Sequence, residues 1–330
     1  MKKLMNKPEA YTDDMLKGIY AAHPDCVTYA AGDLRCYCTT RKKPGKVAII
    51  TGGGTGHLPL FLGYVGQGML DGCGVGGVFQ SPSAAQIFNV TKEVENGGGV
   101  LYLYGNYTGD IMNFDMAAEM CELEDIETRS IVGADDVLSS KSVDTRRGVA
   151  GIFFMYKCAG AAAERMMTLD EVLAVAQKAK DNTRTVGFAL SPCIIPEVGH
   201  PNFTLGENEM AMGMGIHGEP GLWNGPVKTA DELAQECVNS ILEDMPLAEG
   251  SEVALLINGL GATSQEELYI LSGSVTELLK AKGLKIHRTF VGEYATSMEM
   301  AGASVSICRL DEELKSLLDD PAHTPFYTQV

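Results

Sequence analysis

The chain has 330 residues, of which 45 % are hydrophobic and 21 % charged, ordinary values for a globular protein that buries a core. This length favours two domains, since a single domain commonly spans roughly 100–200 residues. The formal net charge of −17 argues against a nucleic-acid-binding protein, which needs a basic face, and favours a neutral small molecule as the ligand.

The N-terminal residues and the cysteines indicate a protein of a reducing compartment. The sequence MKKLMNKPEAYTDD lacks the apolar segment of a signal peptide. No apolar run approaches the roughly 20 residues that span a bilayer. The nine cysteines include no CxxC pair of the metal-binding type. We therefore expect a cytoplasmic protein with free thiols, no bound metal and no contact with a membrane.

The hydrophobic pattern predicts alternating strands and helices along the whole chain. The first half is expected to contain strands at 46–50, 99–104 and 127–132 and helices at 13–22, 83–95, 111–121, 148–165 and 169–180. The second half is expected to contain strands at 185–190, 252–258, 284–290 and 305–310 and helices at 231–242 and 264–283. This alternation predicts two α/β domains, residues 1–183 and 184–330, each a mixed sheet flanked by helices.

The first predicted strand leads into a glycine-rich segment, TGGGTGH at 51–57. His57 stands where a P-loop needs lysine and where a dinucleotide-binding loop needs its third glycine, so the segment is not a nucleotide loop. Two interpretations stay open. The glycines either allow close packing alone, or they form with His57 the wall of a pocket for a small polar ligand.

An aspartate follows the next predicted strand in GNYTGD at 105–110, directly before a helix. Asp110 could be the N-cap of that helix, a common use of aspartate. It could instead direct its carboxylate into the crevice formed at the carboxyl ends of the strands.

The second half contains a histidine among glycines, GMGIHGEPG at 213–221. His217 either makes local hydrogen bonds only, or binds a ligand that can approach the main chain closely because the neighbouring glycines have no side chains. Glu219 either orients this imidazole or faces solvent.

Seven short motifs follow one another along nearly the whole chain. They are GGGTGHLP (52–59), GYVGQGML (63–70), NYTGD (106–110), RRGVAG (146–151), AGAAAER (159–165), GIHGEPG (215–221) and HTP (323–325). Together they resemble the substrate-binding subunit of bacterial dihydroxyacetone kinases, the kind that works with a separate nucleotide-binding subunit.

The resemblance implies a role for each of the three singled-out residues. His217 would attach covalently to the ketone carbon of dihydroxyacetone as a hemiaminal, Asp110 would accept the proton of the phosphorylated hydroxyl, and His57 would hydrogen-bond the ligand. The substrate-binding site would also include Gly53, Gly54 and Gly105. A carbonyl adduct would admit ketones and exclude polyols such as glycerol, since a hydroxyl carbon does not accept the nitrogen.

The resemblance also implies the partners. The chain itself would bind no cofactor, and ADP or ATP with magnesium would sit on a helical partner subunit. A multidomain phosphocarrier of the phosphotransferase system, charged from phosphoenolpyruvate, would recharge that nucleotide. The chain would form a homodimer.

Two residues depart from the family pattern. Leu58 replaces a glutamate next to His57, and Gly105 stands where a lysine often precedes NYTGD. Both changes lie beside proposed site residues. An alternative therefore stays open, a non-catalytic relative that binds dihydroxyacetone or a related short ketose and acts as coactivator of a transcription factor.

Overall fold

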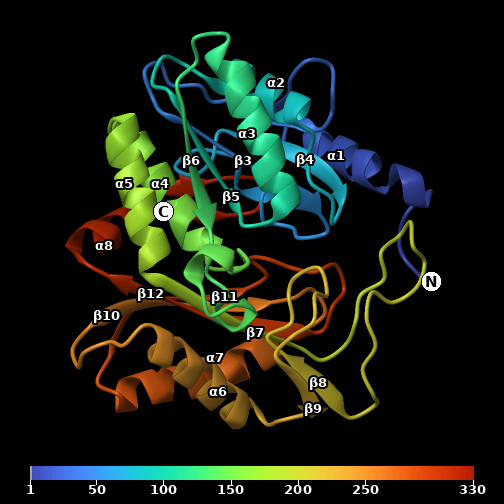
Figure 1. The fold of residues 1–330 in the computed structure, drawn as a ribbon, viewed down its shortest axis with the longest axis vertical. Helices are drawn as coiled ribbons and strands as arrows, with labels where there is room; N and C mark the ends of the chain where they lie inside the picture. The colour runs from blue at the N-terminus through green and yellow to red at the C-terminus, as the bar shows by residue number, and fades with distance from the viewer. Residues whose placement is uncertain (1) are drawn as a thin grey trace. The chain divides into compact units, whose positions relative to one another are not determined.

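The computed structural model describes residues 2–330 as an α/β protein with two six-stranded mixed sheets (Figure 1). This confirms the predicted fold class. The chain folds into two compact units, each built from segments that are separated in the sequence. Unit 1 comprises the residues up to Gly133 together with Met155–Lys178 and Ser316–Val330, and unit 2 comprises Ala134–Phe154 and Ala179–Lys315. The predicted boundary at 183/184 lies near the end of the Met155–Lys178 segment and stays a prediction.

The sheet of unit 1 has the strand order β1-β2-β4-β3-β5-β6. Its strands are β1 (Val27–Tyr29), β2 (Cys36–Thr39), β3 (Ala48–Thr55), β4 (Gly72–Val78), β5 (Val100–Gly105) and β6 (Thr128–Gly133). The pairs β4–β3, β3–β5 and β5–β6 are parallel, and the β1 and β2 pairs are antiparallel. A two-stranded ribbon, β13 (Ala322–His323) with β14 (Thr328–Gln329), completes unit 1.

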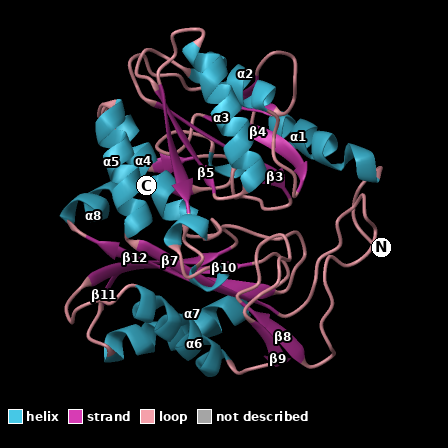
Figure 2. Cartoon of the chain, in the orientation of Figure 1, coloured by secondary structure: helices cyan, strands magenta, loops and turns pink. Residues whose placement is uncertain are grey.

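Unit 1 contains the helices α1 (Tyr11–Ala22), α2 (Ala84–Val94) and α3 (Thr108–Glu122). The division between the units falls inside α4 (Ile152–Glu164), α5 (Leu169–Asp181) and α8 (Glu312–Leu318). Figure 2 shows α2 and α3 side by side over the sheet. Phe114 of α3 stacks on Tyr104 of β5 with ring centroids 4.0 Å apart, and Ile87 and Val90 of α2 are fully buried beside them. This apolar layer packs the middle of α3 against the end of β5.

The glycine segment is largely strand, which corrects the predicted loop. Gly52, Gly53 and Gly54 belong to β3 and pair with β4, a glycine-rich strand that the sequence pattern did not predict. Glycine disfavours strands because it offers no side chain to pack. Close packing overrides that preference here, since a Cβ added at Gly76 would overlap the carbonyl oxygen of Gln80.

The sheet of unit 2 has the strand order β11-β10-β12-β7-β8-β9. Its strands are β7 (Thr183–Ala189), β8 (Glu209–Met212), β9 (Trp223–Pro226), β10 (Glu252–Gly259), β11 (Lys285–Gly292) and β12 (Gly302–Leu310). All neighbours are antiparallel except β10 and β11. Two helices, α6 (Ala230–Asp244) and α7 (Gln265–Ala281), pack on one face (Figure 2). Among residues 2–330, no helix is both long and apolar enough to cross a membrane.

Candidate functional site

His57 is enclosed by two aromatic rings just after β3. The imidazole is fully buried and stacks on Phe79, with ring centroids 4.8 Å apart and an interplanar angle of 17°. Phe61 meets it edge-on at 6.0 Å. Both phenylalanines have positive φ, 58° at Phe79 and 67° at Phe61. Bulky side chains rarely adopt this conformation, and such strain persists where the surroundings over-determine it, often at functional sites.

Gly53 and Gly54 make room for these rings. A Cβ at Gly53 would overlap the ring of Phe61, and one at Gly54 would lie 2.7 Å from the nitrogen of Gln80 and 2.8 Å from Cα of Phe79. Close packing of the glycines is therefore real. It serves to place two aromatic residues around His57.

Gly54→Ala is expected to destabilise the protein by about 1–3 kcal/mol, because the added methyl group meets backbone atoms that cannot rotate away. Thermal or urea unfolding measures the loss. The matched control is Gly18→Ala in α1, where a Cβ has nothing within 4 Å and where alanine is the better helix former. If both substitutions changed stability equally, the packing explanation would be wrong.

Asp110 lies inside α3, so of its two possible roles the N-cap is wrong. The N-cap is Tyr107, and the helix begins at Thr108, earlier than the apolar pattern indicates. Asp110 falls in the first helical turn and is only 4 % exposed. Gly105, the last residue of β5, pairs with Gly133 of β6.

Unit 1 brings the predicted residues to one edge of its sheet. Because β3 and β5 are parallel neighbours, their carboxyl ends lie at the same edge. His57 follows the first strand, and Asp110 follows the second. One short segment joins them: Phe79 stacks on His57, and Ser81 lies against Gly109, where an added Cβ would be 2.7 Å from the Ser81 hydroxyl. This edge is where open α/β sheets commonly bind ligands.

His217 lies in unit 2, in the connection between β8 and β9. Its side chain is 23 % exposed, and its Nδ1 lies 2.8 Å from Oε1 of Glu219. Its backbone N–H donates to Oε2 of the same carboxylate at 2.9 Å, and its carbonyl accepts from Nδ2 of Asn202 at 2.9 Å. A Cβ at Gly215 would overlap Oε2 of Glu219, and Gly218 has a φ of 84°. The flanking glycines thus allow the carboxylate to approach.

The carboxylate of Glu219 is ionised at neutral pH. Burial alone would raise its pKa, but the hydrogen bond and charge of His217, with help from Arg147, outweigh burial and lower the pKa to about 2. An ionised carboxylate only accepts hydrogen bonds. Of the two interpretations of Glu219, the structure therefore favours the one in which it orients the imidazole.

Glu219→Gln is expected to lower the free energy of unfolding by about 1–3 kcal/mol at neutral pH. The pKa of Glu219 lies below its ordinary value of 4.5, so its charge stabilises the fold above that pH. This stabilisation is lost as the pH falls from 4.5 toward about 2. Urea unfolding of both proteins at neutral pH and near pH 3 should show the difference shrinking on acidification. A pH-independent difference would contradict the assignment.

Sequence reasoning missed several residues that hold these side chains. Phe61 and Phe79 gave no pattern that distinguished them from core residues. Arg147 was part of a quoted motif but had no predicted role, and its Nη1 lies 4.0 Å from Oε2 of Glu219. Glu219, two residues beyond the histidine, was not missed, because it was already named from the sequence as a residue that could orient the imidazole.

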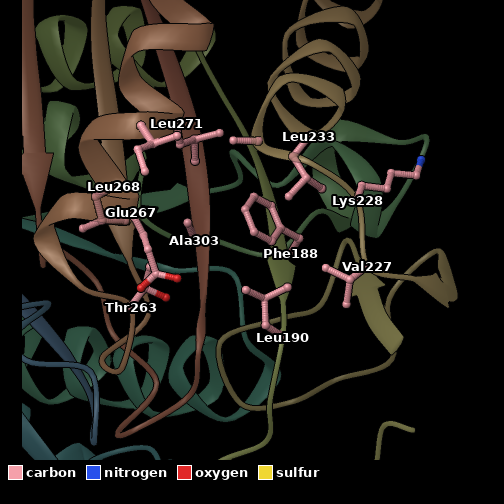
Figure 3. A pocket seen from close by; sticks show the side chains of 12 residues that line it. Phe188, Leu190, Val227, Lys228, Leu233, Thr263, Glu267, Leu268, Leu271 and Ala303 are labelled. Atoms are coloured by element: carbon pink, nitrogen blue, oxygen red, sulfur yellow. The ribbon is translucent and has the colours of Figure 1, made fainter. Parts of the chain in front are cut away.

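A separate cavity of about 260 Å³ lies in unit 2 between α6, α7 and the sheet (Figure 3). Its lining is mostly apolar and includes the buried side chains of Phe188, Leu233 and Leu271. None of the predicted site residues lines it. Among the described residues no group of three or more His, Cys, Asp or Glu side chains is placed to hold a metal ion.

Comparison with known proteins identifies the family. Residues 17–326 match the Dak1 domain. The chain is 44 % identical over 328 residues to the dihydroxyacetone-binding subunit DhaK of PTS-dependent dihydroxyacetone kinase 2 from Listeria innocua, covering 99 % of each. It is also 44 % identical to D-erythrulose kinase from Mycolicibacterium smegmatis, of which it spans 56 %. A solved dihydroxyacetone kinase operon co-activator, DhaQ, superimposes with a TM-score of 0.90 at 32 % identity, with 96 % of this chain and 98 % of that one covered. The chain belongs to the Dak1 family of dihydroxyacetone and erythrulose kinases.

Proposed function

We propose that the chain is the dihydroxyacetone-binding subunit of a phosphoenolpyruvate-dependent dihydroxyacetone kinase. The observation that carries the proposal is the His217 loop, in which an ionised carboxylate holds a half-buried imidazole between glycines. The residues of the Gly53–His57 segment and of Gly105–Asp110 supply the rest of the proposed site. The proposal gives a separate role to each of His57, Asp110 and His217.

The Glu219 contact supports an assignment of the two ring nitrogens of His217. Since the carboxylate only accepts, Nδ1 carries the hydrogen, and in the neutral ring Nε2 carries the lone pair. In the proposed step Nε2 bonds to the ketone carbon and the carbonyl π electrons move to oxygen, which takes up a proton. Nδ1 gives up its hydrogen, so the product is a neutral hemiaminal. Glu219 stabilises the positive charge that the ring bears during the attack.

Asp110 is proposed as the general base for phosphoryl transfer. It would accept the proton of the terminal hydroxyl as the oxygen attacks the γ-phosphoryl group, the part that aspartate plays in other phosphoryl transfers. His57, fixed by Phe61 and Phe79, would hydrogen-bond a ligand oxygen. Gly53, Gly54 and Gly105 would let the backbone approach the substrate closely.

A helical partner subunit would hold the nucleotide with magnesium. ATP would be the phosphoryl donor, and a phosphocarrier charged from phosphoenolpyruvate would convert the resulting ADP back to ATP. The chain itself lacks a P-loop. We propose that it works in the cytoplasm as a homodimer.

A second candidate is a coactivator that binds a short ketose without phosphorylating it. The likeness to the DhaQ structure and the replacements at Leu58 and Gly105 favour it. Gly105 removes a cation that could touch the incoming phosphoryl group.

Reconstitution separates the two. The chain is mixed with a nucleotide-binding subunit, the phosphocarrier proteins, phosphoenolpyruvate and either dihydroxyacetone, D-erythrulose, L-erythrulose or glycerol. A kinase subunit yields the phosphorylated ketose and leaves glycerol unchanged. Adduct formation without turnover, with every partner subunit tried, would contradict the kinase and support the coactivator.

A further inference from the structure

Three hydrogen bonds tie the loop that holds His217 to Glu219. The carboxylate binds both Nδ1 and the backbone N–H of His217, and the backbone carbonyl of Glu219 accepts from Gly215 N–H at 3.1 Å. Any displacement of Glu219 therefore displaces the imidazole. What holds Glu219 consequently sets the position of Nε2.

Arg147 contacts the loop at both ends. Its Nη2 donates to the carbonyl of Gly213 at 2.7 Å, where the loop begins, and its Nη1 lies 4.0 Å from Oε2 of Glu219. The side chain is 14 % exposed, so water screens these contacts weakly. A planar guanidinium has five N–H donors, so it can contact the Gly213 carbonyl and the Glu219 carboxylate at once better than an ammonium group can.

Asp136 in turn holds Arg147. Its Oδ2 accepts from Nε of Arg147 at 3.0 Å and lies 2.9 Å from Nη2. Asp136 is 3 % exposed and forms a parallel bridge with Thr185 of β7, so it is tied to the sheet. The backbones of Asp136 and Arg147 are also joined, by an N–H to carbonyl bond of 3.1 Å. A series of contacts thus runs from β7 through Asp136, Arg147 and Glu219 to the imidazole of His217.

We propose that Arg147, held by Asp136, is a positioning residue that sets His217 for attack through Glu219 and the Gly213 carbonyl. The inference rests on the proposed function, since it assumes that His217 captures a ketone. Arg147 touches neither substrate nor the reacting atoms in this assignment. It acts by holding the Glu219 carboxylate and the Gly213 carbonyl in place.

The test measures adduct formation in the full chain with dihydroxyacetone, by intact mass and by the observed rate at several ketose concentrations. Arg147→Gln is expected to slow adduct formation roughly tenfold to a hundredfold, the scale of a misplaced reacting group. In the reconstituted kinase, KM for dihydroxyacetone should rise while kcat at saturation changes less. Arg147→Lys keeps the positive charge but loses the forked guanidinium. Its rate of adduct formation should lie between the rates of the wild type and Arg147→Gln.

Arg184→Gln is the matched control. Its side chain is 13 % exposed, it lies in the same unit, and it pairs with Asp244 of α6. This variant should lose stability without slowing the adduct. If Arg184→Gln and Arg147→Gln slowed the adduct in proportion to their loss of stability, Arg147 would be merely structural and the inference wrong.

Three further outcomes decide whether Arg147 positions His217. If Arg147→Gln fails to fold, Arg147→Lys carries the test, and an adduct rate equal to that of the wild type overturns the inference. If the wild type forms an adduct but not on His217, or forms none, the proposed function itself fails. Normal adduct chemistry in a folded Arg147→Gln protein overturns the positioning role alone.

Discussion

His217→Ala is expected to keep its fold and to lose covalent attachment of dihydroxyacetone completely. The side chain lies in a loop and is partly exposed, so its removal costs little core packing. No other nucleophile replaces it in that loop, where the neighbouring side chains are Ile216 and Glu219. Intact mass spectrometry after incubation with the ketose should show the wild type heavier by one ligand and the variant unchanged.

A suitable control is His200→Ala, an exposed histidine of the same unit whose Nδ1 lies 3.1 Å from the neighbouring Pro201 carbonyl oxygen. Its adduct should form as in the wild type. A ligand-sized mass increment that survived in His217→Ala would mean that another residue is the nucleophile.

Asp110→Asn is expected to form the adduct normally and to lower turnover by about a hundredfold or more, the usual effect of losing a general base. The amide has nearly the same shape as the carboxylate but cannot accept a proton. Because the N-cap of α3 is Tyr107 and asparagine is nearly isosteric with aspartate, the substitution should leave the helix in place. Intact mass and the rate of ketose phosphorylation with saturating partner subunits separate the two steps.

Asp115→Asn, an exposed aspartate on the same helix, provides the comparison and should leave turnover unchanged. If turnover of Asp110→Asn fell only twofold, the carboxylate would serve to stabilise the start of the helix and not catalysis. Loss of the adduct in this variant would show that the two steps are not separate.

Sequence patterns predicted best where local signals and packing agree. Both α6 and α7 begin within a residue or so of their predicted starts, since each opens with a capping box, Thr229 with Glu232 and Ser264 with Glu267. The strands with apolar, partly β-branched runs were also found, as at Val100–Gly105 and Glu252–Gly259. In these elements the side chains themselves specify the structure.

Prediction failed where backbone proximity decides the structure. The glycine strand β4 has no apolar alternation, and the glycines of β3 resemble a loop until the neighbouring strand is known. The same reason hid the short pair β8 and β9 around His217. The links from Phe79 to His57 and from Arg147 to Glu219 join residues distant in sequence, and no spacing rule reports them.

The discontinuous make-up of unit 1 has a consequence for synthesis on the ribosome. Unit 1 includes Ser316–Val330, where Thr324 donates to the Gly63 carbonyl at 2.8 Å and His323 pairs with Gln67. All of unit 2 has been translated before that segment emerges, although translation of unit 1 begins first. The six strands of the His57 sheet all precede residue 134, so this sheet is translated before unit 2. The native packing of unit 1 is completed only at the end of translation, when its C-terminal segment reaches Gly63 and Gln67.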